Sequence, residues 1–262
     1  MATAIITGGS SGLGLEFARA LASQGYNLAI IARGEAALAA VCGELSQKYH
    51  IKARGISADL SDRRVADQIV SLIDHTHDLA YFVNNAGFAV HLDMTDDSKE
   101  ARRAHEAAAQ VMGINVVLFS TAAAKVMKRQ GYGHIINVAS TASLTFQGHY
   151  SALKSYVVTF TESVALNLRG TGVWATAVCP SWMKTNFHRE AGLGEPNIPS
   201  WLYMQPTKVV QAALKGAKKG KAVVVPTIRW KIIYWWLDHG PIACRRHFTM
   251  WYLNNGNYSK KH

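Results

Sequence analysis

The stretch Thr3-Ala-Ile-Ile-Thr-Gly-Gly-Ser-Ser-Gly-Leu-Gly14 decides the fold, because a short apolar strand runs directly into a glycine-rich turn. Apolar residues then recur with helical spacing from Leu15 to Ala22, so the order is strand, turn and helix. Such a turn places backbone N–H groups at the start of a helix, where they can bind a pyrophosphate. The dinucleotide contacts predicted in this turn are Gly8, Ser10, Ser11, Gly12, Leu13 and Gly14.

Arg33 follows the second apolar strand, Leu28–Ala32, where a dinucleotide-binding fold meets the adenosine ribose. A carboxylate at this point binds the free 2′-hydroxyl of NAD, whereas an arginine suits the 2′-phosphate of NADP. The nearest acid, Glu35, lies two residues further on, where a helix is expected to begin. The sequence therefore predicts NADP, with NADPH preferred over NADH.

Strands and helices alternate along the rest of the chain, with further strands expected at 53–57, 80–83, 134–139, 174–179 and 222–225. This alternation predicts an α/β fold: one Rossmann-type domain with a doubly wound, seven-stranded parallel sheet and helices on both faces. In such folds ligands bind beyond the carboxyl ends of the strands. The residues that follow these strands, and that we expect to contact the cofactor, are Arg33, Asp59, Leu60, Asn85, Ala86, Gly87, Pro180 and Thr185.

A second stretch, Ser140-Thr-Ala-Ser-Leu-Thr-Phe-Gln-Gly-His-Tyr-Ser-Ala-Leu-Lys154, leads from a strand end into a long helical pattern. Tyr150 and Lys154 are four residues apart and lie on one face of that helix. A phenol is a poor base at neutral pH, since its ordinary pKa is about 10, and a nearby ammonium lowers that pKa. The Ser140 hydroxyl can hold a substrate oxygen. Taken alone this spacing is weak evidence, but beside the other motifs it indicates a catalytic site.

In this order, the motifs resemble the short-chain dehydrogenase/reductase family over about residues 3–226. The resemblance rests on Thr7–Gly14, Asn84–Gly87, Asn115, Ser140, Tyr150–Lys154 and Pro180–Thr185. It implies an NADP-dependent enzyme, similar to 17β-hydroxysteroid dehydrogenases and 3-oxoacyl reductases, that transfers hydride between NADP(H) and a ketone or secondary alcohol. It also implies roles for four residues. Tyr150 would be the general acid/base, and Ser140 would orient the substrate oxygen. Lys154 and Tyr150 would contact the nicotinamide ribose, and Asn115 would hold a water that relays protons.

The sequence departs from the family pattern at three points. The interval from Ser140 to Tyr150 is a few residues shorter than usual, which makes Ser143 a rival for the catalytic serine. Ser181 stands where a glycine usually follows the proline. His149, directly before Tyr150, is expected to be either a satisfied surface histidine or a group that senses pH or contacts substrate.

The composition fits a folded globular domain. The 262 residues are 49% apolar and 17% charged, which argues against disorder. The three cysteines have no paired spacing, so we expect no disulfide framework and no metal site, and a reducing, cytoplasmic compartment fits. We find no signal peptide at the N-terminus, and no run of uncharged apolar residues reaches the roughly 18 needed to span a membrane.

The segment at about residues 181–206 is expected to form a lid over the substrate. Its large apolar side chains are Trp182, Met183, Phe187, Trp201, Leu202, Tyr203 and Met204. They indicate either a bulky apolar substrate, such as a steroid, an acyl chain or an aromatic ketone, or simple packing of the lid on the core.

The segment 227–262 is expected to be an extension packed on or beside the domain of residues 1–226. Residues 208–262 hold 11 Lys or Arg and one acid, Asp238, whereas residues 1–207 hold 17 Lys or Arg and 16 acids. Aromatic and basic residues interleaved in this way suit the surface of a membrane. A subunit contact or a wall of the substrate pocket is an equal alternative, and nucleic acid is disfavoured because no nucleic-acid motif accompanies the bases.

Two classes of function remain. An enzyme requires Asn115, Ser140, Tyr150 and Lys154 together, whereas a catalytically silent NADP-binding scaffold or regulator does not. The intact set therefore favours the enzyme. The expected partners are a small apolar carbonyl or alcohol substrate and further copies of the same chain in a homo-oligomer.

Overall fold

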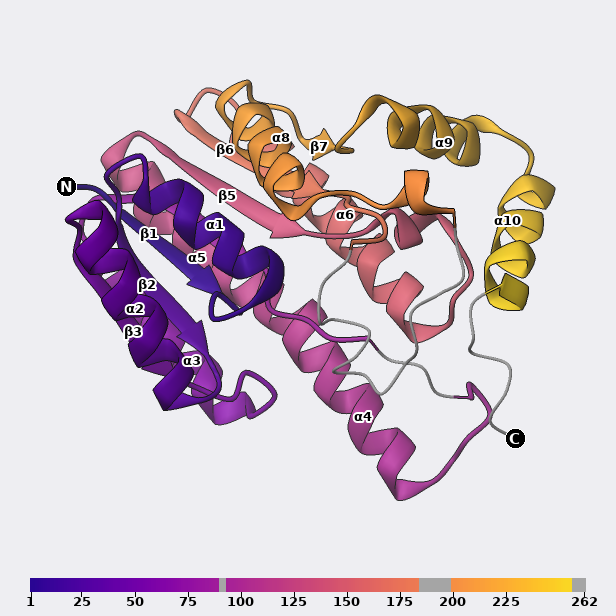
Figure 1. The fold of residues 1–262 in the computed structure, drawn as a ribbon, viewed down its shortest axis with the longest axis horizontal. Coiled ribbons are helices and arrows are strands. Elements are labelled where there is room, and N and C mark those ends of the chain that lie inside the picture. The colour runs from indigo at the N-terminus through magenta and orange to yellow at the C-terminus, as the bar shows by residue number, and fades with distance from the viewer. Residues whose placement is uncertain (90–92, 184–198, 256–262) are drawn as a thin grey trace.

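The computed structural model describes residues 1–89, 93–183 and 199–255 (Figure 1). Its centre is a parallel seven-stranded sheet in the order β3-β2-β1-β4-β5-β6-β7. The strands are β1 (Thr3–Thr7), β2 (Asn27–Ala32), β3 (Ala53–Ser57), β4 (Leu79–Asn84), β5 (Gly133–Val138), β6 (Val173–Val178) and β7 (Val223–Val224). The strand order reverses between β1 and β4, as in a doubly wound sheet. The predicted α/β fold is confirmed.

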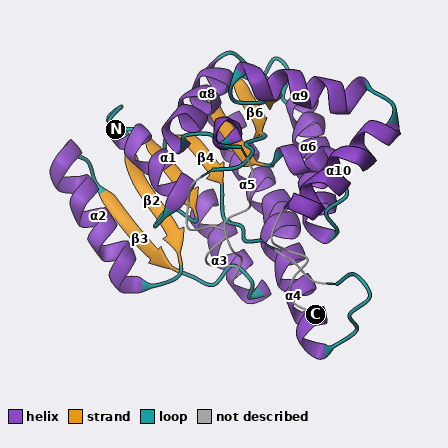
Figure 2. Ribbon diagram, turned by 45° about the vertical axis from the view of Figure 1, so that its right-hand side comes forward, coloured by secondary structure: helices purple, strands orange, loops and turns teal. Residues whose placement is uncertain are grey.

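Helices cover both faces of the sheet (Figures 1 and 2). One face is covered by α1 (Gly12–Ala22), α2 (Glu35–Tyr49) and α8 (Pro206–Lys218), and the other by α3 (Arg63–Asp74), α5 (Asn115–Gln130) and α6 (His149–Asn167). Strand β1 shows why its sequence is apolar throughout: Ile6 packs with the helices of the first face and Ile5 with those of the second. A parallel strand buried on both faces needs such a continuous apolar run.

One long helical segment joins α4 (Lys99–Ala109), a π-helical turn η1 (Gln110–Ile114) and α5. It contains an apolar window long enough to cross a membrane, but 67% of that window is buried inside the protein. Phe119 and Met127 of this segment are fully buried against the sheet. Packing in the core therefore accounts for its apolar composition.

Two helices, α9 (Ile228–His239) and α10 (Ile242–Asn255), lie at the far end of the sheet from β3 (Figures 1 and 2). The Trp230 indole donates a hydrogen bond to the Leu202 carbonyl at 2.9 Å, which attaches α9 to the short helix η3 (Ser200–Leu202). The Thr249 hydroxyl accepts from the Phe146 backbone N–H at 3.1 Å, which attaches α10 to the loop before α6. These contacts hold the extension against the Rossmann-type domain.

Candidate active site

A cavity of about 700 Å³ opens beyond the carboxyl ends of the strands. Loops after β1 to β6, the start of α6 and residues of α9 and α10 contribute to its walls. The predicted site residues that line it are Gly8, Ser10, Ser11, Gly12, Leu13, Arg33, Asp59, Leu60, Asn85, Ala86, Gly87, Ser140, Tyr150, Lys154 and Pro180. Gly14 and Asn115 lie behind this lining, and Thr185 lies outside the described residues.

The glycine loop between β1 and α1 is held in place by Asn85. Its side-chain amide donates to the carbonyl oxygens of Thr7 at 3.0 Å and Gly8 at 3.1 Å. Gly8 has a φ of +66°, a conformation that glycine adopts without strain. A Cβ added at Gly14 would overlap the Gly8 carbonyl oxygen, so α1 can approach this closely only with glycine at that position. The loop and the first turn of α1 therefore form a cradle that fits a pyrophosphate.

Polar side chains inside the strands fix the loops around this cradle. The Thr7 hydroxyl accepts from the backbone N–H groups of Asn85 and Ala86, each at 3.0 Å. The Asn84 amide donates to the Asn137 side-chain oxygen at 2.9 Å and so links β4 to β5. Sequence reasoning assigned no role to the side chains of Thr7 and Asn137. Their signal was a polar residue inside an otherwise apolar strand, since such a residue needs a partner when buried.

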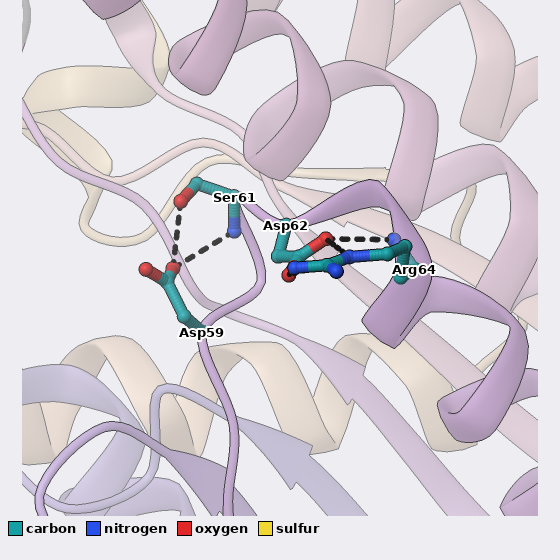
Figure 3. Close-up of polar contacts among 4 residues, drawn as sticks. All are labelled: Asp59, Ser61, Asp62 and Arg64. Carbon is teal, nitrogen blue, oxygen red and sulfur yellow. Dashed lines mark hydrogen bonds and ion pairs between the residues drawn. The ribbon is translucent and has the colours of Figure 1, made fainter.

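The part of the cavity beside β2 and β3 carries Arg33 and Asp59. The Asp59 carboxylate accepts from the backbone N–H and the hydroxyl of Ser61, at 3.0 and 2.8 Å (Figure 3). These bonds hold the pKa of Asp59 below its ordinary value, with a smaller contribution from the Arg33 guanidinium. Asp62 caps α3 and pairs with the Arg64 guanidinium at 2.7 Å (Figure 3). Arg64 is therefore engaged, whereas Arg33 makes no hydrogen bond or ion pair within the described part of the chain.

Asn115 lies where the π-helical turn meets α5. Its backbone N–H bonds to the Gln110 carbonyl, five residues back instead of four, and such turns are frequent at functional sites. Its side chain donates to the Leu60 carbonyl at 2.7 Å and accepts from the Gln110 amide at 2.6 Å. Asn115 thus joins the long helix to the loop after β3. The relay water that the resemblance assigns to Asn115 stays a prediction.

Ser140, Tyr150 and Lys154 come together at the end of β5. The Ser140 hydroxyl is hydrogen-bonded to the Tyr150 hydroxyl. The Lys154 ammonium donates to the Val138 carbonyl at 2.9 Å and lies 5.6 Å from the centroid of the Tyr150 ring. The structure therefore places a hydroxyl, a phenol and an ammonium side by side on the cavity wall.

Ser143 does not reach this group. A turn of 3-10 helix, η2 (Thr141–Leu144), follows Ser140 and turns Ser143 into the interior, where it is buried and off the cavity lining. The shortened loop before Tyr150 is closed instead by Thr145 and Ser151, whose hydroxyls lie 3.1 Å apart. The geometry therefore pairs Ser140, and not Ser143, with Tyr150.

Burial determines the charge states of the two titratable groups. Burial raises the pKa of Tyr150 to about 12, and the hydrogen bond with Ser140 only partly opposes it. Burial also lowers the pKa of Lys154 to about 8. The expected lowering of the Tyr150 pKa by Lys154 does not appear, because removal from solvent has the larger effect. The phenol stays protonated at neutral pH and is ready to donate its proton.

His149 is bonded to a second histidine. Its Nδ1 atom lies 2.8 Å from Nδ1 of His105 on α4, so one imidazole donates and the other accepts. Burial, and to a smaller extent His105, lower the pKa of His149. The pair bridges α4 and α6 away from the cavity lining. This arrangement matches the first expectation, a histidine satisfied by a neighbour.

An aromatic cluster forms another part of the cavity wall. Trp182, from the loop after β6, meets Trp230 of α9 and Tyr252 of α10, with ring centroids 5.2 and 5.3 Å apart. Phe248 of α10 stacks on the same indole at 6.4 Å. All four side chains line the cavity, and the Tyr252 phenol contributes to raising the Tyr150 pKa. Of the roles considered for the extension, these contacts show it as a wall of the pocket.

Only the two ends of the expected lid belong to the described residues. Ser181, Trp182 and Met183 line the cavity, and the Met204 N–H donates to the Trp182 carbonyl at 2.7 Å. Trp201 is 56% exposed and does not line the cavity. Phe187 lies outside the described residues.

Comparison with known proteins gives consistent results. The sequence profile described as short chain dehydrogenase matches residues 2–195. The D-beta-hydroxybutyrate dehydrogenase of Cupriavidus necator is 35% identical over 191 residues, which cover 70% of this chain and 71% of that protein. The 3-oxoacyl-[acyl-carrier-protein] reductase of Synechocystis sp. is 32% identical over 217 residues, which cover 79% and 85%.

Solved structures share the fold. A short-chain dehydrogenase from Sphingobium yanoikuyae in complex with NADPH has a TM-score of 0.81 at 24% identity, over 89% of this chain and 92% of its own. A 7beta-hydroxysteroid dehydrogenase has a TM-score of 0.84 at 21% identity, over 95% and 96%.

Proposed function

The chain belongs to the short-chain dehydrogenase family, and from this premise we propose that it is an NADP-dependent oxidoreductase acting on a bulky apolar ketone or secondary alcohol. The observation that carries this proposal is that Ser140, Tyr150 and Lys154 line the same cavity as the glycine loop. When bound, the nicotinamide supplies the hydride, so the protein aligns the reactants and delivers the proton. Consumption of NADPH in the presence of a panel of apolar ketones tests the proposed function.

The roles of the side chains follow from their positions. In the reducing direction the Tyr150 hydroxyl would give its proton to the carbonyl oxygen of the substrate as the carbonyl carbon receives the hydride that a bound cofactor would supply, which yields the alcohol. Ser140 donates a hydrogen bond to that oxygen and aligns it with Tyr150. Lys154, whose ammonium lies beside the Tyr150 ring, would hold the nicotinamide ribose. With its pKa raised to about 12, Tyr150 is protonated at neutral pH, as a proton donor must be.

The aromatic wall supports an apolar substrate. Trp182, Trp230, Phe248 and Tyr252 present rings to the cavity, and the basic side chains among the described lining residues are Arg33 and Lys154, which the proposal assigns to the cofactor. Flat apolar groups pack well against such rings. Substrates of this kind include steroids, 3-oxoacyl chains and aryl ketones, and relatives named as a 3-oxoacyl reductase and a hydroxysteroid dehydrogenase agree with this class.

Exposed apolar side chains on α5 and α6 support self-association. Ile114, just before α5, and Leu118 within it are 49% and 39% exposed, and Tyr156 and Leu166 on α6 are 48% and 59% exposed. These helices lie on the same face of the sheet. We therefore keep the homo-oligomer as a proposal, with this face as the contact.

Arg33→Ala is expected to remove most of the preference for NADPH. The guanidinium is on the cavity wall and makes no hydrogen bond or ion pair with the described residues, so it can pair with the 2′-phosphate through a charge-assisted bond of roughly 1.5–3 kcal/mol. Fluorescence titration should show NADPH binding roughly tenfold or more tightly than NADH before the change, and nearly equal affinities after it.

Arg54→Ala is the matched control, because Arg54 is an exposed arginine on β3 that does not line the cavity. It should leave both affinities unchanged. Equal affinities for NADPH and NADH in the unmodified protein would refute the proposed cofactor preference.

Ser140→Ala is expected to lower turnover more than Ser143→Ala. The first change removes the hydroxyl bonded to Tyr150, which amounts to one hydrogen bond to a charged or reacting group and roughly a 10- to 100-fold loss. The second removes a buried hydroxyl behind the cavity and should alter turnover only a few-fold. Steady-state kinetics of both variants on one ketone measure the two losses of turnover. The reverse order would show that Ser143 holds the substrate oxygen.

A further inference from the structure

The helices α9 and α10 have two apolar faces, of which only one is covered. On α9 the covered face includes Trp230 and Leu237, which are 2% and 1% exposed. On α10 it includes Tyr252, which is 3% exposed and stacks on Trp182. Of these residues, Trp230 and Tyr252 line the cavity described above. The covered faces explain one set of large apolar residues in the extension but leave a second set unexplained.

The second set faces solvent. Ile228, Ile232 and Trp235 recur at helical spacing on α9 and are 74%, 64% and 60% exposed. Eight of the eighteen exposed large apolar side chains of the described residues lie on these two helices. The eight are Ile228, Ile232, Trp235, Trp236, Ile242, Met250, Trp251 and Leu253. A concentration of this kind on one part of a surface marks a contact with something else.

The neighbours extend the same surface. Trp201, which is also exposed, lies beside α9, where its carbonyl accepts from the Arg229 guanidinium at 3.2 Å. Phe146, likewise exposed, is bonded through its backbone to Thr249 of α10. Exposed apolar side chains therefore also occur on the loops that the two helices touch.

The charges on this surface are almost all positive. Arg229, Lys231 and Arg246 are exposed among the apolar side chains. The one acid of the extension, Asp238, is paired with Arg245 at 3.3 Å, so it does not neutralise the others. The partner that covers this surface must therefore combine an apolar layer with negative charge.

We propose that the outer faces of α9 and α10 dock on an anionic lipid surface. Tryptophan and isoleucine side chains enter the boundary between headgroups and acyl chains, and the arginine and lysine side chains meet the anionic headgroups. A second copy of the chain fits this surface poorly, because it would bring like charges together. A nucleic acid would pair with the positive charges but would not cover the exposed isoleucine side chains.

Docking also has a consequence for the active site. This consequence rests on the proposed function, whereas the docking itself does not. The same two helices form the aromatic wall of the cavity, so the cavity would lie directly above the lipid surface. An apolar ketone dissolved in the bilayer would then reach Tyr150 without crossing bulk water.

The test is co-sedimentation of the full chain with vesicles of phosphatidylcholine, with and without phosphatidylglycerol. We expect the protein to sediment with the anionic vesicles at low salt, to be released at high salt, and to bind the neutral vesicles more weakly. Trp235→Ser should lower the partition to anionic vesicles roughly tenfold. The double change Lys231→Gln and Arg246→Gln should lower it roughly 25-fold, since each base contributes about fivefold.

Two controls keep the result specific to this surface. Trp174→Ser changes another exposed tryptophan, on β6, and Lys128→Gln changes an exposed lysine on α5. Neither should affect partition, and unchanged NADPH binding should show that every variant is folded. Equal recovery of the protein in the supernatant with and without anionic vesicles would overturn the proposal. So would a Trp174→Ser variant that loses as much binding as Trp235→Ser, or a dimer in gel filtration that Trp235→Ser dissociates without any binding to vesicles.

Discussion

Tyr150→Phe is expected to lower turnover by roughly 10²- to 10⁴-fold while the affinity for NADPH stays close to that of the unmodified protein. The change removes the hydroxyl that is bonded to Ser140 and keeps the ring that fills the cavity wall. The carbonyl oxygen then has no proton donor, although the cofactor site is intact. Turnover on a reactive ketone and fluorescence titration with NADPH measure the two quantities separately.

Tyr156→Phe provides the matched control. Tyr156 lies on the same helix, α6, but is 48% exposed and does not line the cavity. Its variant should keep the turnover of the unmodified protein. If Tyr150→Phe also kept that turnover, Tyr150 could not be the proton donor and the assignment would fail.

Gly14→Ala is expected to abolish measurable NADPH binding and to lower the free energy of unfolding by about 1–3 kcal/mol or more. The added methyl group would overlap the Gly8 carbonyl oxygen and would lie 2.5 Å from the Asn85 amide nitrogen. Both neighbours belong to the structure that holds the glycine loop, so neither can move without opening the pyrophosphate cradle. Denaturant unfolding and NADPH titration measure the two effects.

Gly43→Ala makes the same chemical change where there is room for it. Gly43 lies inside α2, and a Cβ built there meets no atom within 4 Å. Since alanine is favoured over glycine in a helix by about 1 kcal/mol, this variant should be as stable as the unmodified protein or more stable. NADPH binding by Gly14→Ala at the unmodified affinity would contradict the account of the loop.

The sequence predicts the fold well because its signals are local. The apolar run before Gly8, the glycine spacing and the helical repeat after Gly14 each involve residues close together in the chain. The same is true of Tyr150 and Lys154, which one helix brings to one face. Once the strands are known to be parallel, the rule that their carboxyl ends share one edge places Arg33, Asp59 and Ser140 around one cavity.

The features that sequence reasoning left open or missed depend on contacts between distant segments. Trp182 and Tyr252 form the aromatic wall only because α10 folds back over the loop after β6. The upward shift of the Tyr150 pKa comes mainly from burial, with a smaller effect of Tyr252, whereas spacing alone pointed only to the ammonium of Lys154. The choice between Ser140 and Ser143 likewise depends on the turn η2, which no periodic pattern in the sequence predicts.

The measurement that tests the central claim most directly is transfer of deuterium from NADPH labelled at the nicotinamide C4 position. The labelled cofactor is incubated with an apolar aryl or steroid ketone, and the product is examined by mass spectrometry. We predict one deuterium on the carbinol carbon of the alcohol, formed by the unmodified protein and strongly reduced in Tyr150→Phe. Tight NADPH binding with no labelled alcohol from any ketone of the panel, and no oxidation of the matching alcohols by NADP, would contradict the enzyme and favour a cofactor-binding scaffold.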